Sequence, residues 1–137
     1  MPVPVELARI LIRETNDSHV VELREIDGER VLPIAIGICE AAAIERRLMG
    51  QQPPRPQTHE LLENVIQQLG ATIESVVISD LRHDELGHGT FYARLLLRRD
   101  GETLEIDSRP SDALALTAGT EVPLSVAEHV LDDVDKG

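Results

Sequence analysis

The 137-residue sequence is poor in several residue types, and each shortage excludes a class of protein. Its single cysteine, Cys39, excludes an internal disulfide framework and a cysteine-rich zinc fold. With one phenylalanine, one tyrosine and no tryptophan, the core must be aliphatic, and a platform of rings for stacking nucleic-acid bases is not expected. No apolar run approaches the roughly 18 residues that a membrane-spanning helix needs, so we expect no membrane partner.

Positive charge is also scarce. Lys and Arg together number 13 against 25 Asp and Glu, which gives a formal net charge of −12. Such a balance excludes tight, non-specific coating of DNA or of anionic membranes, although it allows a local phosphate site. All but one of the basic residues are arginines, whose planar forks bind carboxylates and phosphates in a bidentate way. The first ten residues lack a basic segment followed by an apolar core, so we expect no signal peptide and a cytoplasmic location.

The hydrophobic pattern predicts one domain with an α+β fold. Period-two alternation and turn residues indicate strands at residues 5–13, 19–25, 30–36, 71–80, 90–99 and 102–107, a turn at 16–18, and a short strand at 122–124. Helical spacing indicates helices at 40–49, 58–69 and 111–118, and a last short helix from 125. We therefore expect a single compact domain over residues 1–137. A mixed or largely antiparallel sheet would pack with three to four helices, with a core over about 5–131 and a frayed acidic tail over 132–137.

The first strand also predicts an association between copies of the chain. The segment 3–12 is aliphatic, and as an edge strand it would pair with the same strand of a second copy. A two-fold dimer is the commonest closed form of such an assembly. We therefore favour a homo-oligomer, with a dimer as its form.

The segment from Asp107 to Asp112 carries the densest set of chemical groups. A strand ends there and a helix begins at a proline, so free backbone N–H groups would favour an anion. In a phosphodiester site, Asp107 and Asp112 would hold a divalent cation, Arg109 would bind a phosphate oxygen, and Ser111 would add a hydroxyl. The alternative is structural: Ser111 and Asp112 cap the helix, and Arg109 pairs with Asp107 or Asp112.

Two other helix starts offer related chemistry. Arg55 precedes the second helix, and His59 in its first turn is a candidate general base or metal ligand. Alternatively, His59 is an exposed residue of a capped helix. Glu40 begins the first helix, where it either complements the helix dipole or faces a metal site.

Four stretches taken together resemble a known family. They are LPIAIGICEAAAI at 32–44, RPQTHELL at 55–62, GTFYARL at 89–95 and DSRPSDALAL at 107–116, followed by VPLSV. In this order and spacing they resemble the bifunctional nuclease family, also called the DNase/RNase domain family, over about residues 5–131. The resemblance implies a compact α+β domain, a homo-oligomer and a nuclease activity on both DNA and RNA.

The resemblance extends to individual residues. The positions that match the family pattern include Glu40, Arg55, His59, Phe91, Tyr92, Asp107, Arg109, Ser111 and Asp112. Gln57 and Glu60 depart from the family's usual Leu and Asp. Residues 117–119 replace its Ala-Leu-Arg, so that one phosphate-seeking charge is absent.

Three functions follow from these residues. The first is a metal-dependent nuclease that makes weak or local contact with nucleic acid. Its catalytic residues would be Arg55, His59, Asp107, Arg109, Ser111 and Asp112, and Glu40, Asp107 and Asp112 would hold Mg²⁺ or Mn²⁺. The second is a non-catalytic binding or regulatory module, in which the RPSD and RPQTH segments form a structural polar network. The third is a sensor of a small anion or ligand that binds at the same helix starts. The family resemblance makes nuclease the function that we expect.

Overall fold

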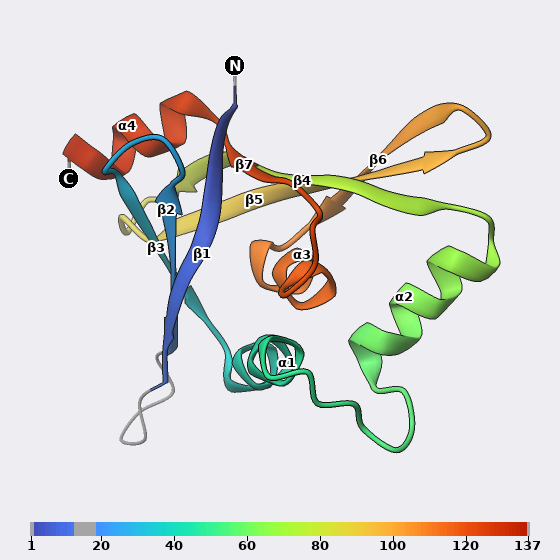
Figure 1. Cartoon of the computed structure of the whole chain (residues 1–137). Helices are drawn as coiled ribbons and strands as arrows, with labels where there is room; N and C mark the ends of the chain where they lie inside the picture. The colour runs from blue at the N-terminus through green and yellow to red at the C-terminus, as the bar shows by residue number, and fades with distance from the viewer. Residues whose placement is uncertain (1, 13–18, 137) are drawn as a thin grey trace.

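Seven strands form one curled, mixed sheet in a computed structural model that describes residues 2–12 and 19–136, the last two by their backbone alone (Figure 1). The order in the sheet is β3-β2-β1-β7-β4-β5-β6. The strands are β1 (Val3–Leu11), β2 (His19–Glu25), β3 (Val31–Ile36), β4 (Thr72–His83), β5 (Gly89–Arg99), β6 (Glu102–Ser108) and β7 (Leu124–Val126). The described helices are α1 (Ile38–Leu48), α2 (Thr58–Gln68), α3 (Pro110–Thr117) and α4 (Glu128–Lys136). The predicted α+β fold in a single compact domain is confirmed.

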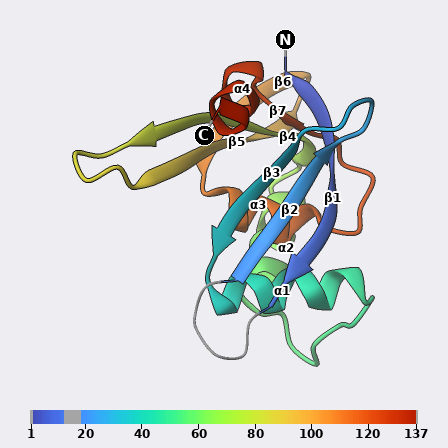
Figure 2. The same cartoon turned by 90° about the vertical axis from the view of Figure 1, so that its left-hand side faces the viewer.

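Two antiparallel meanders make up the sheet, and β7 joins them. β7 pairs antiparallel with β1 and parallel with β4, so the last strand in the sequence lies at the centre of the sheet. Figure 1 shows the two meanders meeting at an angle, with α3 in the corner between them. In Figure 2, β1, β2 and β3 run side by side, and the long hairpin of β4 and β5 extends outward on the left.

The core is aliphatic, as the shortage of rings predicts. Its largest fully buried side chains are those of Leu23, Leu32, Ile44, Ile78, Leu114, Leu116 and Leu131, with Val21, Val76, Val126 and Val130. α3 is apolar on nearly every side, and all its residues except Asp112 are buried. A helix that is hydrophobic all round belongs in a core. Asp112 is therefore the one residue of α3 that is not buried, and it lies in the first turn of a helix that is packed into the core.

Local signals predicted several connections correctly. Pro33 lies in β3, which is an edge strand of the sheet, as expected for a residue that lacks an N–H. Asp100 and Gly101 connect β5 to β6 with φ values of 51° and 80°. A two-residue turn with positive φ at both positions matches the twist of a hairpin.

Four expectations need correction or cannot be compared. β1 lies between β2 and β7, so it is not an edge strand as expected, although β7 pairs only with its residues 3–5; the association of two copies through residues 3–12 stays a prediction. The short strand lies at 124–126 rather than 122–124, because Pro123 has no N–H for a ladder. The acidic residues after 131 belong to α4 instead of a frayed tail, since Arg30 binds Asp132 and Glu128 at 2.9 and 3.1 Å. The predicted turn at 16–18 lies outside the described residues.

α2 differs from an ordinary core helix in how little of it is buried. Ile66 is its one buried residue, while Leu61, Leu62 and Val65 are exposed, as is Leu69 at the C-cap. Figure 1 shows α2 standing away from the sheet, next to α3. This placement leaves a hollow between α2, α3 and the strands β5 and β6, and the site described below borders it.

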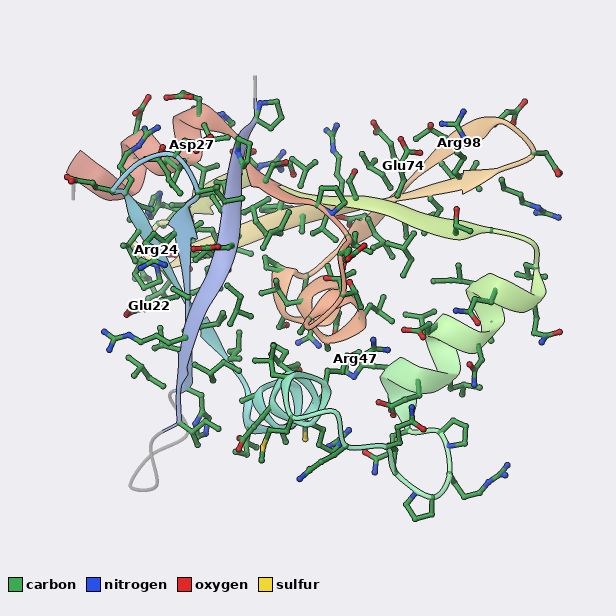
Figure 3. All side chains as sticks on the ribbon, in the orientation of Figure 1. Glu22, Arg24, Asp27, Arg47, Glu74 and Arg98 are labelled. Atoms are coloured by element: carbon green, nitrogen blue, oxygen red, sulfur yellow. The ribbon has the colours of Figure 1, made fainter. Side chains whose placement is uncertain are left out.

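Most of the described arginines form ion pairs with carboxylates. Arg98 lies 3.7 Å from Glu74 and Arg24 lies 2.9 Å from Glu6, and all four side chains are labelled in Figure 3. Arg47 pairs with Glu63, between α1 and α2. Each of these arginines is therefore neutralised by a nearby carboxylate. Within the described residues, no helix is long and apolar enough to cross a membrane.

Candidate active site

The site begins at the junction between β6 and α3. Arg109 is the N-cap of α3, with extended backbone angles of −73° and 145°, and Pro110 occupies the first turn. Proline fits that position because its missing N–H is one that a helix start leaves unpaired in any case. The hydroxyl of Ser108 donates a hydrogen bond to the carbonyl oxygen of Arg109 at 2.8 Å. The hydrogen bond from Ser108 and the ring of Pro110 thus restrict the backbone of Arg109.

The guanidinium of Arg109 joins two helices. Its Nε donates to Oδ2 of Asp112 at 2.8 Å, and its Nη2 donates to Oδ1 of Asp112 at 2.9 Å and to Oε1 of Glu40 at 2.8 Å. This fork is the bidentate geometry in which arginine binds carboxylates most strongly. The Nη1 group has no hydrogen-bond partner among the described residues, and 65% of the Arg109 side chain is exposed. One edge of the guanidinium is thus held, and the other is free to bind a ligand.

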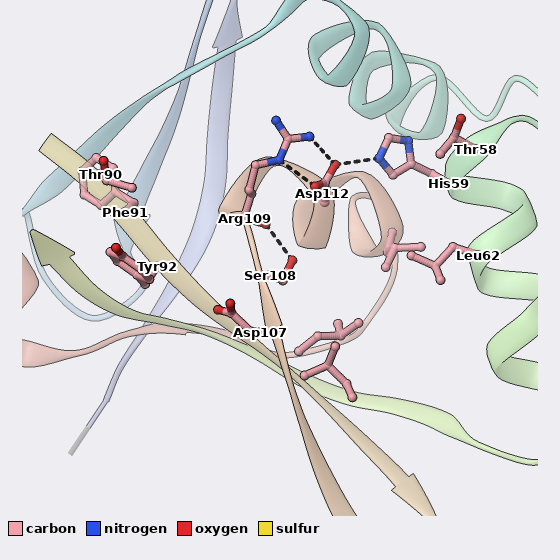
Figure 4. Close-up of a pocket in the computed structure, with 13 residues that line it drawn as sticks. Thr58, His59, Leu62, Thr90, Phe91, Tyr92, Asp107, Ser108, Arg109 and Asp112 are labelled. Atoms are coloured by element: carbon pink, nitrogen blue, oxygen red, sulfur yellow. Dashed lines mark hydrogen bonds and ion pairs between the residues drawn. The ribbon is translucent and has the colours of Figure 1, made fainter. Parts of the chain in front are cut away.

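His59 completes the cluster from a third helix. Its Nε2 lies 3.1 Å from Oδ1 of Asp112, as the dashed line in Figure 4 marks. Because the partner is a carboxylate acceptor, we assign the ring proton to Nε2, which leaves Nδ1 as a potential base. Only 13% of the His59 side chain is exposed. We call Glu40, His59, Arg109 and Asp112 the Arg109 network.

The electrostatics of the network keep Asp112 ionised. Burial by itself disfavours the carboxylate, but the hydrogen bonds from Arg109 and His59 outweigh it and lower the pKa of Asp112. The same contacts, first from Asp112 and then from Glu40, raise the pKa of Arg109. At neutral pH the carboxylate is therefore ionised and available to orient the His59 ring.

A cavity of about 630 Å³ opens beside the Arg109 network. His59, Arg109 and Asp112 line its polar end, and Leu62, Ile106 and Leu116 line its apolar part. In Figure 4, Arg109, Asp112 and His59 lie across the top of this hollow, in front of α3. A site with a convergent polar group at the edge of an apolar cavity is the usual form of a small ligand or substrate site.

The structure brings four of the predicted site residues together, namely the members of the Arg109 network. Asp107 lines the same cavity from β6, but it is exposed and lies apart from the network in Figure 4. Ser111 is buried and lines a second cavity. Arg55 is exposed in the proline-rich loop and lines neither cavity. Catalytic roles for Asp107, Ser111 and Arg55 stay predictions.

The predicted metal ligands do not fit a divalent cation in this arrangement. Arg109 occupies the carboxylates of Glu40 and Asp112, and Asp107 faces the cavity from another element. Throughout the described part of the chain, no group of three His, Cys, Asp or Glu side chains is close enough to hold a metal ion. The ion pair between Arg109 and Asp112 is one of the two pairings that the structural interpretation of this segment allowed.

The aromatic wall of the cavity was not predicted from the residue chemistry. Phe91 and Tyr92 both line it, although the sequence singled them out only as matches to a family pattern. Arg82 lies over the Tyr92 ring at 4.6 Å from its centre, which is a cation–π contact. The available signal was that the chain's two rings stand next to each other in one strand.

The lowered pKa of Asp112 predicts how acid affects stability. Because the pKa is lower in the folded chain than its ordinary value of 3.8, the carboxylate contributes stability above 3.8, which is lost as pH falls through the folded value. We expect Asp112→Asn to lower the melting temperature at pH 7 and to reduce the loss on acidification below pH 4. Thermal melts of both proteins from pH 7 to pH 2.5 measure this. Parallel melting curves, with the same loss in both proteins, would contradict it.

Comparison with known proteins supplies the family context. The model of the bifunctional nuclease domain matches residues 21–136, a range that includes the whole Arg109 network. An uncharacterized protein of Mycobacterium tuberculosis is 40% identical over 127 residues, which cover 93% of this chain and 73% of that protein. Bifunctional nuclease 1 of Oryza sativa subsp. indica is 26% identical over 123 residues, which cover 87% of this chain and 36% of the rice protein.

Proposed function

Because the chain belongs to the bifunctional nuclease domain family, we propose that it is a nuclease that hydrolyses phosphodiester bonds of DNA and RNA. We propose the cavity beside the Arg109 network as its active site. The observation that carries this assignment is the chain of contacts from Arg109 through Asp112 to His59 at the edge of that cavity. The name of the rice relative, which shares 26% of its residues with this chain in the aligned region, supports the same activity.

Arg109 would bind the phosphodiester. Its free Nη1 edge offers two N–H donors, while the contacts with Glu40 and Asp112 hold the rest of the fork in place. A donor that is already oriented stabilises the charge that develops on the phosphate oxygens without a cost of reorganisation. The arginine therefore has two roles, since it holds the site together and also contacts the substrate.

His59 would transfer the proton. A water molecule attacks phosphorus, its proton passes to Nδ1 of His59, and the bond from phosphorus to the leaving oxygen breaks. The protonated ring then returns the proton to the leaving oxygen, so that charge and atoms balance. Asp112 keeps the ring in the required tautomer and stabilises its cationic form, as an ionised carboxylate does in other oriented histidines.

A nuclease assay tests the proposal. Wild-type chain, purified by two independent routes, is incubated with single-stranded DNA and with RNA beside an Asp112→Asn variant purified in the same way. We expect wild-type protein from both routes to cleave and Asp112→Asn to cleave more slowly. Equal rates for the two proteins, or cleavage in only one preparation, would indicate a contaminating nuclease and reject the proposal.

Dependence on Mg²⁺ or Mn²⁺ is proposed from the sequence alone. Because Arg109 holds Glu40 and Asp112 in this arrangement, a cation would bind them only if Arg109 released a carboxylate, and the same assay tests the dependence. Loss of activity in a chelator, with recovery on adding either ion, would support it. Activity that is unchanged in the chelator would instead favour a reaction carried by His59 and Arg109 alone. Asp112→Asn is compared with the wild type both with and without chelator, so either outcome leaves that test valid.

One observation favours the second candidate, a non-catalytic module. Arg109 occupies two carboxylates and thereby ties α3 to α1, as a purely structural network would. In that case the wild-type chain shows no nuclease activity and Arg109→Ala only lowers stability. We also propose a homo-oligomer, a cytoplasmic location and weak, local contact with nucleic acid. Sedimentation, cell fractionation and the salt dependence of binding test these in turn.

A further inference from the structure

The strand β6 is the edge of the sheet opposite to β3. It is last in the strand order, and among the described residues it pairs only with β5. An edge strand presents a row of backbone N–H and C=O groups that another strand can bind. The other edge strand, β3, contains Pro33, which has no N–H to donate, whereas β6 contains neither proline nor lysine over its seven residues. Of the two edges, β6 is therefore the better suited to accept a further strand.

β6 also exposes two aliphatic side chains on the face of the sheet that the helices cover. Leu104 lies opposite Leu97 of β5, and Ile106 lies opposite Leu95, and opposed residues point to the same face. Leu95 and Leu97 are buried in one cluster with residues of α2 and α3. Leu104 and Ile106, in contrast, are 37% and 43% exposed. The apolar layer thus continues beyond the core to the edge of the sheet.

An exposed stripe of α2 continues this apolar surface. Leu62 lines the same cavity as Ile106, and Val65 and Leu69 follow Leu62 at helical spacing, so that all three lie on one face of the helix. Figures 1 and 2 both show α2 and α3 beneath the half of the sheet that β4, β5 and β6 form. A contiguous apolar surface of this kind marks an interaction site. We call Leu62, Val65, Leu69, Leu104 and Ile106 the β6–α2 face.

A second copy of β6, running antiparallel, matches this edge. Two-fold symmetry pairs such a strand with itself about one central residue. With Glu105 at the centre, Leu104 of each copy lies opposite Ile106 of the other, so two aliphatic pairs form on the face that the helices cover. Cross-strand pairs of this kind stabilise a sheet. Because a dimer of standard size buries about 800 Å² on each partner, more than a strand edge offers, the stripe of α2 would contribute to the contact as well.

Charges on the outer face of β6 complement those of a second copy. Asp107 forms no ion pair among the described residues, and in this register it lies opposite Thr103 of the second copy. Arg98 lies opposite Thr103 within one copy and is largely exposed. Two strand spacings, about 10 Å, then separate the backbones of Asp107 and the other copy's Arg98, a gap that the two extended side chains bridge. Glu105 of both copies would meet at the axis, where each has Arg94 at 3.5 Å.

We propose that two copies of the chain associate through the edge of β6 and the β6–α2 face as a two-fold dimer. The proposal assigns an interface to the proposed homo-oligomer and rests on it, but it does not rest on nuclease activity. Ile106 lines the cavity beside the Arg109 network, so Leu104 of the second copy would extend the apolar wall of that cavity. Each candidate active site would therefore border a residue of the other copy.

Sedimentation of the wild-type chain and of Leu104→Lys tests the association. One chain has a mass of 15.1 kDa, and we expect the wild type to sediment at twice that mass. Lysine on an edge strand opposes pairing with another strand. Because the change occurs twice in a two-fold interface, Leu104→Lys should weaken the association at least about tenfold. Circular dichroism of the same samples shows that the variant is folded.

Val31→Lys is the matched control for this variant. Val31 is 42% exposed and lies on β3, the other edge strand, so the same change at a similar exposure falls outside the proposed interface. Val31→Lys should sediment as the wild type does. A dimer that persists in Leu104→Lys, or one that is lost equally in both variants, would overturn the proposal. So would a monomeric wild type, which would leave the β6–α2 face to a different protein.

Cross-linking tests the position of the axis without disturbing the apolar pairs. In a Cys39→Ser background, Glu105→Cys places one thiol of each copy next to the other, and a short bis-maleimide should join the two chains. Ala8→Cys in the same background is exposed and lies within residues 3–12, the segment whose pairing the sequence predicts. Cross-linking of Glu105→Cys in preference to Ala8→Cys would support the proposal, and the reverse would overturn it. Neither measurement involves cleavage, so failure of this interface leaves the nuclease proposal intact.

Discussion

Replacing His59 by glutamine is expected to lower the rate of nucleic-acid cleavage by about 10²- to 10⁴-fold, the usual contribution of a general acid–base residue. The change removes the base but keeps a group that can donate to Asp112, because the glutamine amide carries N–H groups at a similar reach. The carboxylate 3.1 Å from the ring therefore keeps a partner. We expect the melting temperature to change little, so that the loss belongs to chemistry and not to folding. Initial rates on single-stranded DNA and RNA, with melts of the same samples, measure both quantities.

The chain provides a matched control in His129. Its Nε2 lies 3.2 Å from Oδ1 of Asp80, so it makes the same type of contact as His59, but its side chain is 65% exposed and lies outside the cavity. His129→Gln should cleave at the wild-type rate. A wild-type rate in His59→Gln, or an equal loss in both variants, would exclude His59 as the base.

Arg109→Ala should have the second largest effect, because it removes both a phosphate donor and the centre of the network. Loss of one oriented donor to a developing charge costs about 10²- to 10³-fold in rate. The variant also leaves Glu40 and Asp112 without their cation, and these side chains are only 14% and 32% exposed. Breaking a fully buried pair costs roughly 3–5 kcal/mol. Since the guanidinium is 65% exposed to water, we expect about 1–2 kcal/mol here.

Two further variants separate the roles of Arg109. Arg109→Lys keeps the charge but loses the fork, so it should recover part of the stability and little of the activity. Arg94→Ala removes an exposed arginine that pairs with Glu105 at 3.5 Å, and it should change neither quantity. Denaturant melts and cleavage rates are compared for the three variants. If the wild type is active and Arg109→Ala is less stable but cleaves at the wild-type rate, Arg109 has a structural role alone.

Local features of this chain were predictable because they depend on neighbouring residues. The Asp100–Gly101 turn, Pro110 at the start of α3 and the alternation of the strands each follow from backbone geometry over a few residues. The aliphatic core follows from composition, since few rings are available to fill it. The family resemblance, now supported by a domain match over residues 21–136, likewise needed only the order and spacing of motifs.

Long-range arrangement was less predictable. The sequence suggested that residues 3–12 form an edge strand, yet β7 from the end of the chain pairs with residues 3–5 and places β1 inside the sheet. The apolar pattern of α2 is also compatible with a buried helix, but the helix packs beside α3 and leaves most of that face exposed. Pairing and packing of this kind depend on shapes that form only when distant segments meet.

The candidate site depends both on local sequence features and on the packing of distant segments. Residue types and helix starts were sufficient to nominate Glu40, His59, Arg109 and Asp112 as chemically capable groups. Their convergence depends on the fold, because Arg109 contacts Glu40 across 69 residues and Asp112 contacts His59 across 53. The fold also determined that the Arg109 guanidinium contacts both carboxylates, and that Ser111 lines a separate cavity. A sequence motif specifies which groups are present, but the distances between groups on different helices are set by how those helices pack.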